Sequence, residues 1–179
     1  MDPATDLAAW LDRVTFADLS TDQVTLRIID EVSAWGGDHG WRVYRRAPSV
    51  VPLPPPMDKQ HSVLDVACAR PDGPPLAIEV DHTDRGRTVD KLVAEAAAGR
   101  VPIWVRWGTG KFREPPAPVR MVTLEVTRRG RLNTRMPDRP PPRHGSRITV
   151  VEAVPIFKPE AGPSFEPEAG PSFKPEEEA

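Results

Sequence analysis

Two short apolar strands joined by a tight turn constrain the fold of this chain most strongly. Residues 62–69 (SVLDVACA) and 76–82 (LAIEVDH) both alternate in the manner of strands, and the PDGPP between them predicts a turn. Residues 88–98 then predict a helix with Thr88 as its N-cap, and 102–107 (PIWVRW) predict another buried strand. A hairpin followed by a helical crossover to a further strand predicts an α/β fold, with a mixed central β-sheet flanked by helices.

The remaining elements are expected on both sides of this unit. Apolar residues at helical spacing predict a helix over residues 5–18, and the capping box STDQ at 20–23 opens a second helix. That second helix is expected to end near Trp35, because Gly36 and Gly37 follow it. Three further segments are expected to be strands and one Pro-rich segment a loop: 41–47, 119–126 and 147–154, and the loop 52–56.

The chain divides by composition near residue 156. Residues 1–155 are expected to form the α/β domain. Residues 156–179 contain three related units rich in Pro, Glu and Gly, which begin at Phe157, Phe165 and Phe173. Such units bury too little apolar area to offset their ordering entropy, so we expect a disordered acidic tail. In one alternative, this tail is the working part of a small interaction protein.

Several classes of protein are excluded by the composition. Cys68 is the only cysteine, which rules out an internal disulfide and a cysteine-built zinc site and fits a reducing cytoplasm. No run of 18 apolar residues is present, and the acidic N-terminus does not resemble a secretory signal. We therefore expect a cytoplasmic protein with no membrane partner. The oligomeric state stays open, a homodimer included.

Charge is distributed unevenly along the chain. Residues 1–84 have 7 basic and 14 acidic groups, a net charge of −7, whereas residues 85–155 have 15 basic and 6 acidic groups, a net charge of +9. A basic half of this kind indicates a polyanionic partner such as DNA, and a solvated surface is the alternative explanation.

Three acids fall on one face of the predicted hairpin. Strand alternation places Asp65, Glu79 and Asp81 together, opposite the apolar residues of both strands. One register pairs Asp65 with Asp81, and a register shifted by two residues pairs it with Glu79; either brings like charges within about 8 Å. Such a cluster persists if it is open to water or neutralised by a hard cation, and its oxygen ligands suit Mg²⁺ or Mn²⁺.

Glu31 is a fourth candidate ligand. On a helical wheel it falls inside the apolar arc of the second helix, and an inward-facing Glu needs a partner. It either joins the acid cluster or lies at the rim of the helix, paired with an arginine.

With these residues in place, the chain resembles the PD-(D/E)XK nuclease superfamily over roughly residues 20–107. The motif stands here as Asp65, Glu79, Val80 and Asp81, and Glu31 lies where many members have a helix acid. The resemblance implies a restriction-endonuclease-like core and Mg-dependent hydrolysis of phosphodiester bonds in DNA. It also implies that Asp65, Glu79 and the Val80 carbonyl bind the metal.

One position departs from the family's pattern. The third motif position usually holds Lys, and here it holds Asp81. Asp81 is expected to bind a second metal or to accept a proton from the attacking water. The missing positive charge has replacements in Arg85, Arg87 and Lys91. The helical wheel turns Lys91 away from the sheet, however, and predicts a surface pair between Lys91 and Glu95.

The expected DNA contacts are arginines, which bind phosphates in a bidentate manner. They are Arg85, Arg87, Arg128, Arg129, Arg131, Arg135, Arg139, Arg143 and Arg147. His82 is either a metal ligand or proton relay or, as a lone His at a strand end, structural. Trp104 and Trp107 either stack on bases or pack in the core, and packing is favoured on at least one face. The alternative to the enzyme is a nuclease-fold protein without activity that binds nucleic acid or protein.

Overall fold

The computed structural model describes residues 2–110 and 112–136 of the chain. Within them, three helices are formed: α1 (Pro3–Leu11), α2 (Thr21–Asp38) and α3 (Gly86–Ala97). The strands of the same residues are β1 (Phe16–Leu19), β2 (Arg42–Pro52), β3 (His61–Ala69), β4 (Leu76–Asp81), β5 (Val101–Gly108), β6 (Arg120–Glu125), β7 (Thr127–Arg129) and β8 (Leu132–Arg135). No helix among the described residues is long and apolar enough to cross a membrane.

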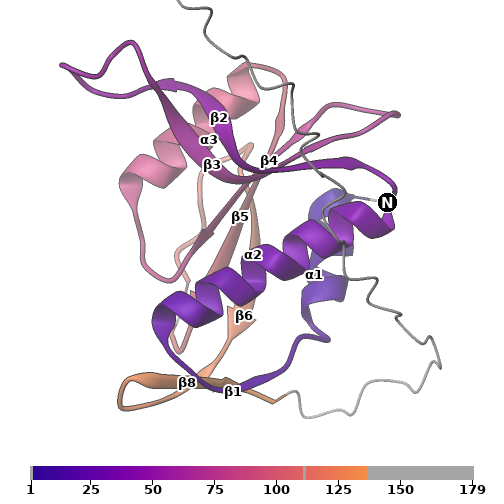
Figure 1. Cartoon of the computed structure of the whole chain (residues 1–179), viewed down its shortest axis with the longest axis vertical. Helices are drawn as coiled ribbons and strands as arrows, with labels where there is room; N and C mark the ends of the chain where they lie inside the picture. Colours follow the sequence, from indigo (N-terminus) through magenta and orange to yellow (C-terminus); the bar gives the residue numbers. More distant parts are fainter. Residues whose placement is uncertain (1, 111, 137–179) are drawn as a thin grey trace, which may run out of the picture. The chain divides into compact units, whose positions relative to one another are not determined.

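A mixed sheet of five strands forms the centre of the domain (Figure 1). Its order is β2-β3-β4-β5-β6. β2, β3 and β4 are antiparallel neighbours, whereas β4, β5 and β6 run parallel. α3 makes the crossover between the parallel strands β4 and β5. The prediction of an α/β fold with a mixed sheet flanked by helices is therefore confirmed.

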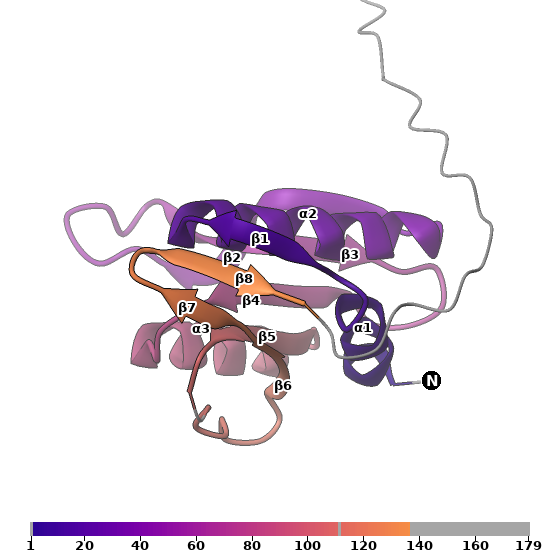
Figure 2. The same ribbon diagram turned by 90° about the horizontal axis from the view of Figure 1, so that it is seen from below.

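Helices cover both faces of this sheet, as Figure 2 shows in the view from below. On one face, α1 and α2 pack on the sheet through a large apolar cluster that includes Leu7, Ile28 and Ile78. On the other face, α3 packs through a much smaller cluster formed by Leu92, Trp104 and Val119. The α3 face therefore has room for polar side chains between the helix and the strands.

The N-terminal helix is shorter than predicted. It ends at Leu11 and not near residue 18, because the chain turns there and Phe16 begins the short strand β1. β1 pairs with β8 in a small second sheet of order β1-β8-β7. Val14 is buried nonetheless. The spacing of the apolar residues therefore predicted correctly which side chains are buried, but it predicted too long a helix.

The second helix begins as predicted but ends later. The capping box is formed, since Gln23 N donates to Ser20 Oγ at 3.3 Å and Ser20 N donates to Gln23 Oε1 at 2.9 Å. The helix continues through both glycines to Asp38. Gly36 is buried against the sheet, and a Cβ added there would lie 2.7 Å from Val43 Cγ2. Close packing of helix on strand thus explains this glycine, which is not a helix stop.

Three further boundaries differ from the prediction. β2 runs on through Ser49 to Pro52, well beyond residue 47, because it pairs with β3 along most of its length. α3 begins at Gly86 with Arg85 as its N-cap and without a side-chain capping bond, so Thr88 is a buried helical residue and not the cap. The predicted strand 147–154, the boundary at residue 155 and the tail lie outside the described residues.

The two glycines of α2 provide a matched test of this packing. Gly36→Ala is expected to lower the free energy of unfolding by about 1–3 kcal/mol, because its methyl group would overlap Val43 and approach Cys68 Sγ. Gly37→Ala meets no atom within 4 Å and is expected to raise it by about 0.4–1 kcal/mol through helix propensity. Urea unfolding of both variants measures these changes. Equal stabilities would contradict the close approach of α2 to the sheet.

Candidate active site

Asp65 on β3 and Glu79 and Asp81 on β4 lie on the face of the sheet that α3 covers, at the point where β3 and β4 separate. The pairs Val66–Ile78 and Cys68–Leu76 fix the register, which continues to place Asp65 opposite Glu79. The register that pairs Asp65 with Asp81 is therefore wrong, and the one shifted by two residues is confirmed. Asp65 Oδ2 accepts a hydrogen bond from Val80 N at 2.8 Å. This carboxylate thereby ties the two strands together at their opening.

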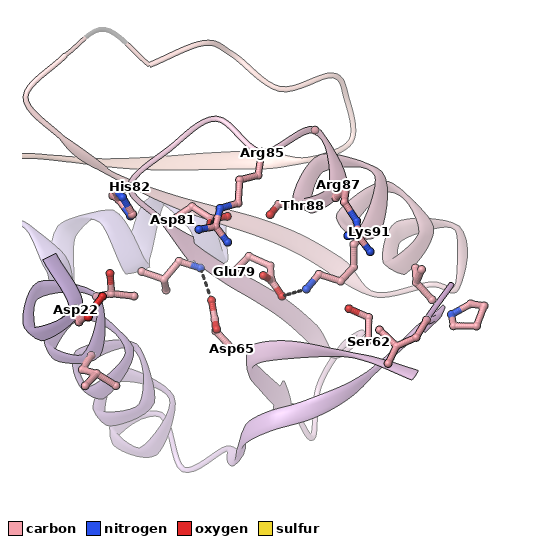
Figure 3. Close-up of a pocket in the computed structure, with 17 residues that line it drawn as sticks. Asp22, Ser62, Asp65, Glu79, Asp81, His82, Arg85, Arg87, Thr88 and Lys91 are labelled. Carbon is pink, nitrogen blue, oxygen red and sulfur yellow. Dashed lines mark hydrogen bonds and ion pairs between the residues drawn. The ribbon is translucent and has the colours of Figure 1, made fainter. Parts of the chain in front are cut away.

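Asp65, Glu79 and Asp81 line a pocket of about 890 Å³ (Figure 3). Its walls come from four elements: the first half of α2, the β2–β3 hairpin, the end of β4 and the first turns of α3. The lining residues are Asp22, Thr25, Leu26, Val51, Pro52, Leu53, Ser62, Asp65, Glu79, Val80, Asp81, His82, Arg85, Gly86, Arg87, Thr88 and Lys91. The pocket thus collects the acids, several cations and some apolar side chains.

Lys91 points into this pocket and contacts Glu79. Its Nζ lies 2.7 Å from Glu79 Oε1 and donates a hydrogen bond to Val63 O at 2.7 Å, and its side chain is only 13% exposed. Figure 3 shows the ammonium group reaching from α3 to the carboxylate on β4. The predicted surface pair between Lys91 and Glu95 is therefore wrong.

The inward stripe of α3 is mostly polar, which explains this error. Thr88, Leu92 and Glu95 are its buried residues, and Lys91 lies at the same spacing. Glu95 accepts hydrogen bonds from Ser49 Oγ at 2.5 Å and from Val50 N at 2.8 Å. A guanidinium nitrogen of Arg100 lies 2.7 Å from Glu95 Oε2. A helical wheel that takes the apolar residues as the inward side misplaces the inward face of α3, because the sheet presents polar partners to this helix.

Burial makes the ionised forms of the floor acids unfavourable. Loss of solvation raises the pKa of Glu79 to about 7, although the contact with Lys91 opposes this rise. Desolvation also raises the pKa of Asp65, against the lowering effect of the hydrogen bond from Val80 N. The neighbouring carboxylates raise both values further. A cation placed among them would favour the ionised forms.

Asp81 and Asp84 are engaged by other groups. Asp81 Oδ2 accepts a hydrogen bond from Trp104 Nε1 at 3.1 Å, and its Oδ1 lies 3.6 Å from Arg85 Nε. Asp84 pairs with the buried guanidinium of Arg106, which lies over the ring of Trp104. Asp81 therefore lies in the pocket with one oxygen near the exposed guanidinium of Arg85, whereas Asp84 does not line the pocket.

Several candidates lie away from the predicted site. Glu31 does not line the pocket; it pairs with Arg27 at 2.8 Å and accepts a hydrogen bond from Trp10 Nε1, so the structure places it at the helix rim. Both Trp104 and Trp107 are buried in the core, and neither offers a face to a base.

His82 lines the pocket, with its ring 5.4 Å from that of Trp107.

The arginines divide into two groups. Arg85 and Arg87 line the pocket. Arg128, Arg129 and Arg131 lie on the exposed β7–β8 hairpin. Arg135 is held by the carbonyls of Val14 and Glu125 and by Asp12, which gives it a structural role. Arg139, Arg143 and Arg147 lie outside the described residues.

One pocket acid was missed by the sequence analysis. Asp22 on the first turn of α2 lines the pocket, where Figure 3 shows it on the side away from Lys91. It lies between Ser20 and Gln23 of the capping box, and acidic residues are common in the first turn of helices because they interact favourably with the helix dipole. The sequence held no signal that separates this common use from a place in a site.

The acids suit a magnesium ion only with help from other ligands. Within residues 2–110 and 112–136, no three His, Cys, Asp or Glu side chains are grouped so that they would hold a metal ion. Mg²⁺ often takes only one or two carboxylates and completes its shell with waters and substrate phosphates. Asp65 and Glu79 provide two such groups, both facing the pocket. These two carboxylates alone do not make a metal site, and an ion bound here would need waters and substrate phosphates to complete its shell.

Searches against protein-family models, curated proteins and solved structures found no match to this chain. The resemblance to nucleases thus depends on the chain's own residues and on their arrangement.

The raised pKa of Glu79 predicts a pH dependence of stability. Between pH 4.5 and about 7 the folded state retains a proton that the unfolded state has lost, so the free energy of unfolding falls as pH rises. Compared with Glu79→Gln, the native protein should lose up to about 3 kcal/mol over this range and nothing further above it. Urea unfolding in EDTA at several pH values measures the difference. A difference independent of pH would contradict the burial of this carboxyl.

Proposed function

We propose that this chain is a metal-dependent nuclease that hydrolyses phosphodiester bonds in DNA. The observation that supports it most is the contact of Lys91 with Glu79, 2.7 Å apart in the pocket that also contains Asp65. Two acids and a lysine are the chemical groups that the nuclease motif requires. Asp81 stands where that lysine is usual, and Lys91 supplies the positive charge from the following helix instead.

The order of elements supports a restriction-endonuclease-like core. α2, the β2–β3 hairpin, β4, α3 and β5 follow one another in the order that the resemblance implies for residues 20–107. Asp65 lies on the second strand of the hairpin and Glu79 near the end of the next strand, as in the motif. These positions support the proposal that the two acids correspond to those of the motif.

Asp65 and Glu79 would hold the metal. The backbone carbonyl of Val80, which lies between Glu79 and Asp81 in the sequence, would be a further oxygen ligand. When bound, a divalent ion lowers the pKa of a coordinated water and polarises the scissile phosphate. Asp65 is oriented for this role by the hydrogen bond from Val80 N, which fixes one of its oxygens at the opening of the strands. Val80 itself lines the pocket.

The other pocket residues move protons and bind charge. Hydrolysis forms a P–O bond to water and breaks the P–O bond to the sugar oxygen, so the attacking water must lose a proton and the leaving oxygen must gain one, which a second solvent water donates. Asp81, held through Oδ2 by Trp104, presents its other oxygen as a proton acceptor. Arg85, Arg87 and Lys91 stabilise the negative charge on the phosphate. A single free cysteine, Cys68, which is buried, fits an activity located in the cytoplasm.

A binding module without activity is the second candidate. It is favoured by the engagement of both acids: Asp65 is bonded to Val80 N, and Glu79 is paired with Lys91. In this case Lys91 only neutralises a buried charge, and the pocket binds nucleic acid without cutting it. Metal binding separates the two candidates.

Metal ions are expected to stabilise the native protein and to support cleavage. Millimolar Mg²⁺ or Mn²⁺ should raise the melting temperature, because a ligand that binds only the folded state stabilises it. Single-stranded or plasmid DNA should be cut with metal and not with EDTA. Glu79→Gln should abolish both effects, whereas the exposed control Glu125→Gln on β6 should retain them. An unchanged melting temperature together with uncut DNA would reject the nuclease and favour the binding module.

A further inference from the structure

We infer that the pocket accepts a single-stranded segment of DNA, with a base on each side of the scissile phosphate, and excludes an intact duplex. This inference rests on the proposed function for the position of the phosphate. It concerns the form of the substrate, which is determined by the walls of the pocket rather than by the acids at its floor.

The acids at the floor of the pocket are almost fully buried. Glu79 is only 6% exposed and Asp81 only 8% exposed. α2, the β2–β3 hairpin and α3 contribute lining residues on separate sides of these acids. In a duplex the bases stay stacked and the backbone cannot fold inward. A flexible single strand can bring one phosphate down to these recessed acids, as it does in enzymes that act on unpaired nucleotides.

The volume fits a short piece of one strand. The pocket measures about 890 Å³, which is within the range of about 300–1,000 Å³ that encloses drug-sized molecules. A nucleotide is a molecule of this size. The pocket therefore matches one phosphate with parts of its two neighbouring nucleosides.

Apolar side chains line the pocket on two sides of the acids. Leu26 on α2 is 54% exposed, although it is a large apolar residue. It lies one helical turn after Asp22, and Figure 3 shows Asp22 and Ser62 on opposite sides of Asp65 and Glu79. On the Ser62 side, the hairpin contributes the apolar residues 51–53. Phosphate recognition needs no such surface, whereas unstacked bases do.

The charges agree with a strand that crosses the floor. Arg85 at the N-cap of α3 and Arg87 and Lys91 within the helix line the pocket together with the acids. Cations placed this way serve one or two phosphates at close range. A protein that tracks a duplex needs cations spaced along its outer surface instead. The exposed arginines of the β7–β8 hairpin do not line this pocket.

Binding without cleavage tests the inference directly. Fluorescence anisotropy with Ca²⁺ in place of Mg²⁺, whose looser coordination suits binding rather than cleavage, compares a labelled single-stranded oligonucleotide of roughly 12 nucleotides with the same sequence as a duplex. The full chain should bind the single strand at least about ten-fold more tightly. Leu26→Gln should weaken single-strand binding about five-fold or more and leave duplex binding unchanged. Leu26→Met should retain the affinity of the native protein.

Two controls locate the effect in the pocket. Leu132→Gln on β8 alters an apolar residue that is 43% exposed and lies outside the pocket, and it should change neither affinity. Individual bases of the oligonucleotide are replaced by abasic sites. At one position the replacement should weaken binding to the native protein, and at that same position it should leave binding to Leu26→Gln unchanged. Loss of additivity of this kind shows that the base and the side chain are in contact.

The outcomes separate this inference from the proposed function. Equal affinity for both DNA forms, or a single-strand affinity that Leu26→Gln leaves unchanged, overturns the inference, and cleavage with metal can still succeed. Absence of binding to either form also overturns it. Preferential binding of single strands together with failure of metal-dependent cleavage supports the inference on the pocket and rejects the nuclease.

Discussion

The ion pair of Lys91 with Glu79 links the crossover helix α3 to the central strand β4, and the candidate site depends on it. Glu79 is buried on a face of the sheet where the apolar cluster is small, so its charge would be costly without a partner. Lys91 supplies that partner at 2.7 Å and also bonds to the Val63 carbonyl on β3. The Lys91 side chain thus joins α3, β4 and β3. The continuous apolar core lies on the opposite face of the sheet.

The topology of the sheet explains why the pocket lies where it does. β4 pairs with an antiparallel neighbour on one side and a parallel neighbour on the other, and the chain must leave its end to reach α3. The loop after β4 therefore lies beside the opening between β3 and β4, where Asp65 bonds to Val80 N in place of a regular ladder contact. The long hairpin and the start of α2 complete the walls (Figure 3).

Alternation along two strands was enough to predict the common face of Asp65, Glu79 and Asp81, because strand geometry has a period of two residues. The mixed sheet followed from the order of the elements, a hairpin and then a helical crossover to a further strand. Lys91 could not be placed in the same way. The helical wheel assumes that the inward stripe is apolar, and in α3 that stripe holds Thr88, Lys91 and Glu95, whose partners come from other elements. Gly36 shows the same limit, since a side chain there is excluded by Val43, which lies on a different element, β2.

The central claim is that Lys91 does the work of the lysine that the motif lacks at position 81, and removal of its charge tests it most directly. Cleavage of a single-stranded oligonucleotide with Mg²⁺ is measured for Lys91→Met and for the control Lys59→Met, which alters an exposed lysine outside the pocket. We expect Lys91→Met to lose about 10²-fold or more in rate, because the positive charge beside Glu79 is gone, and Lys59→Met to cut at the native rate. Cleavage by Lys91→Met at the native rate would contradict the account.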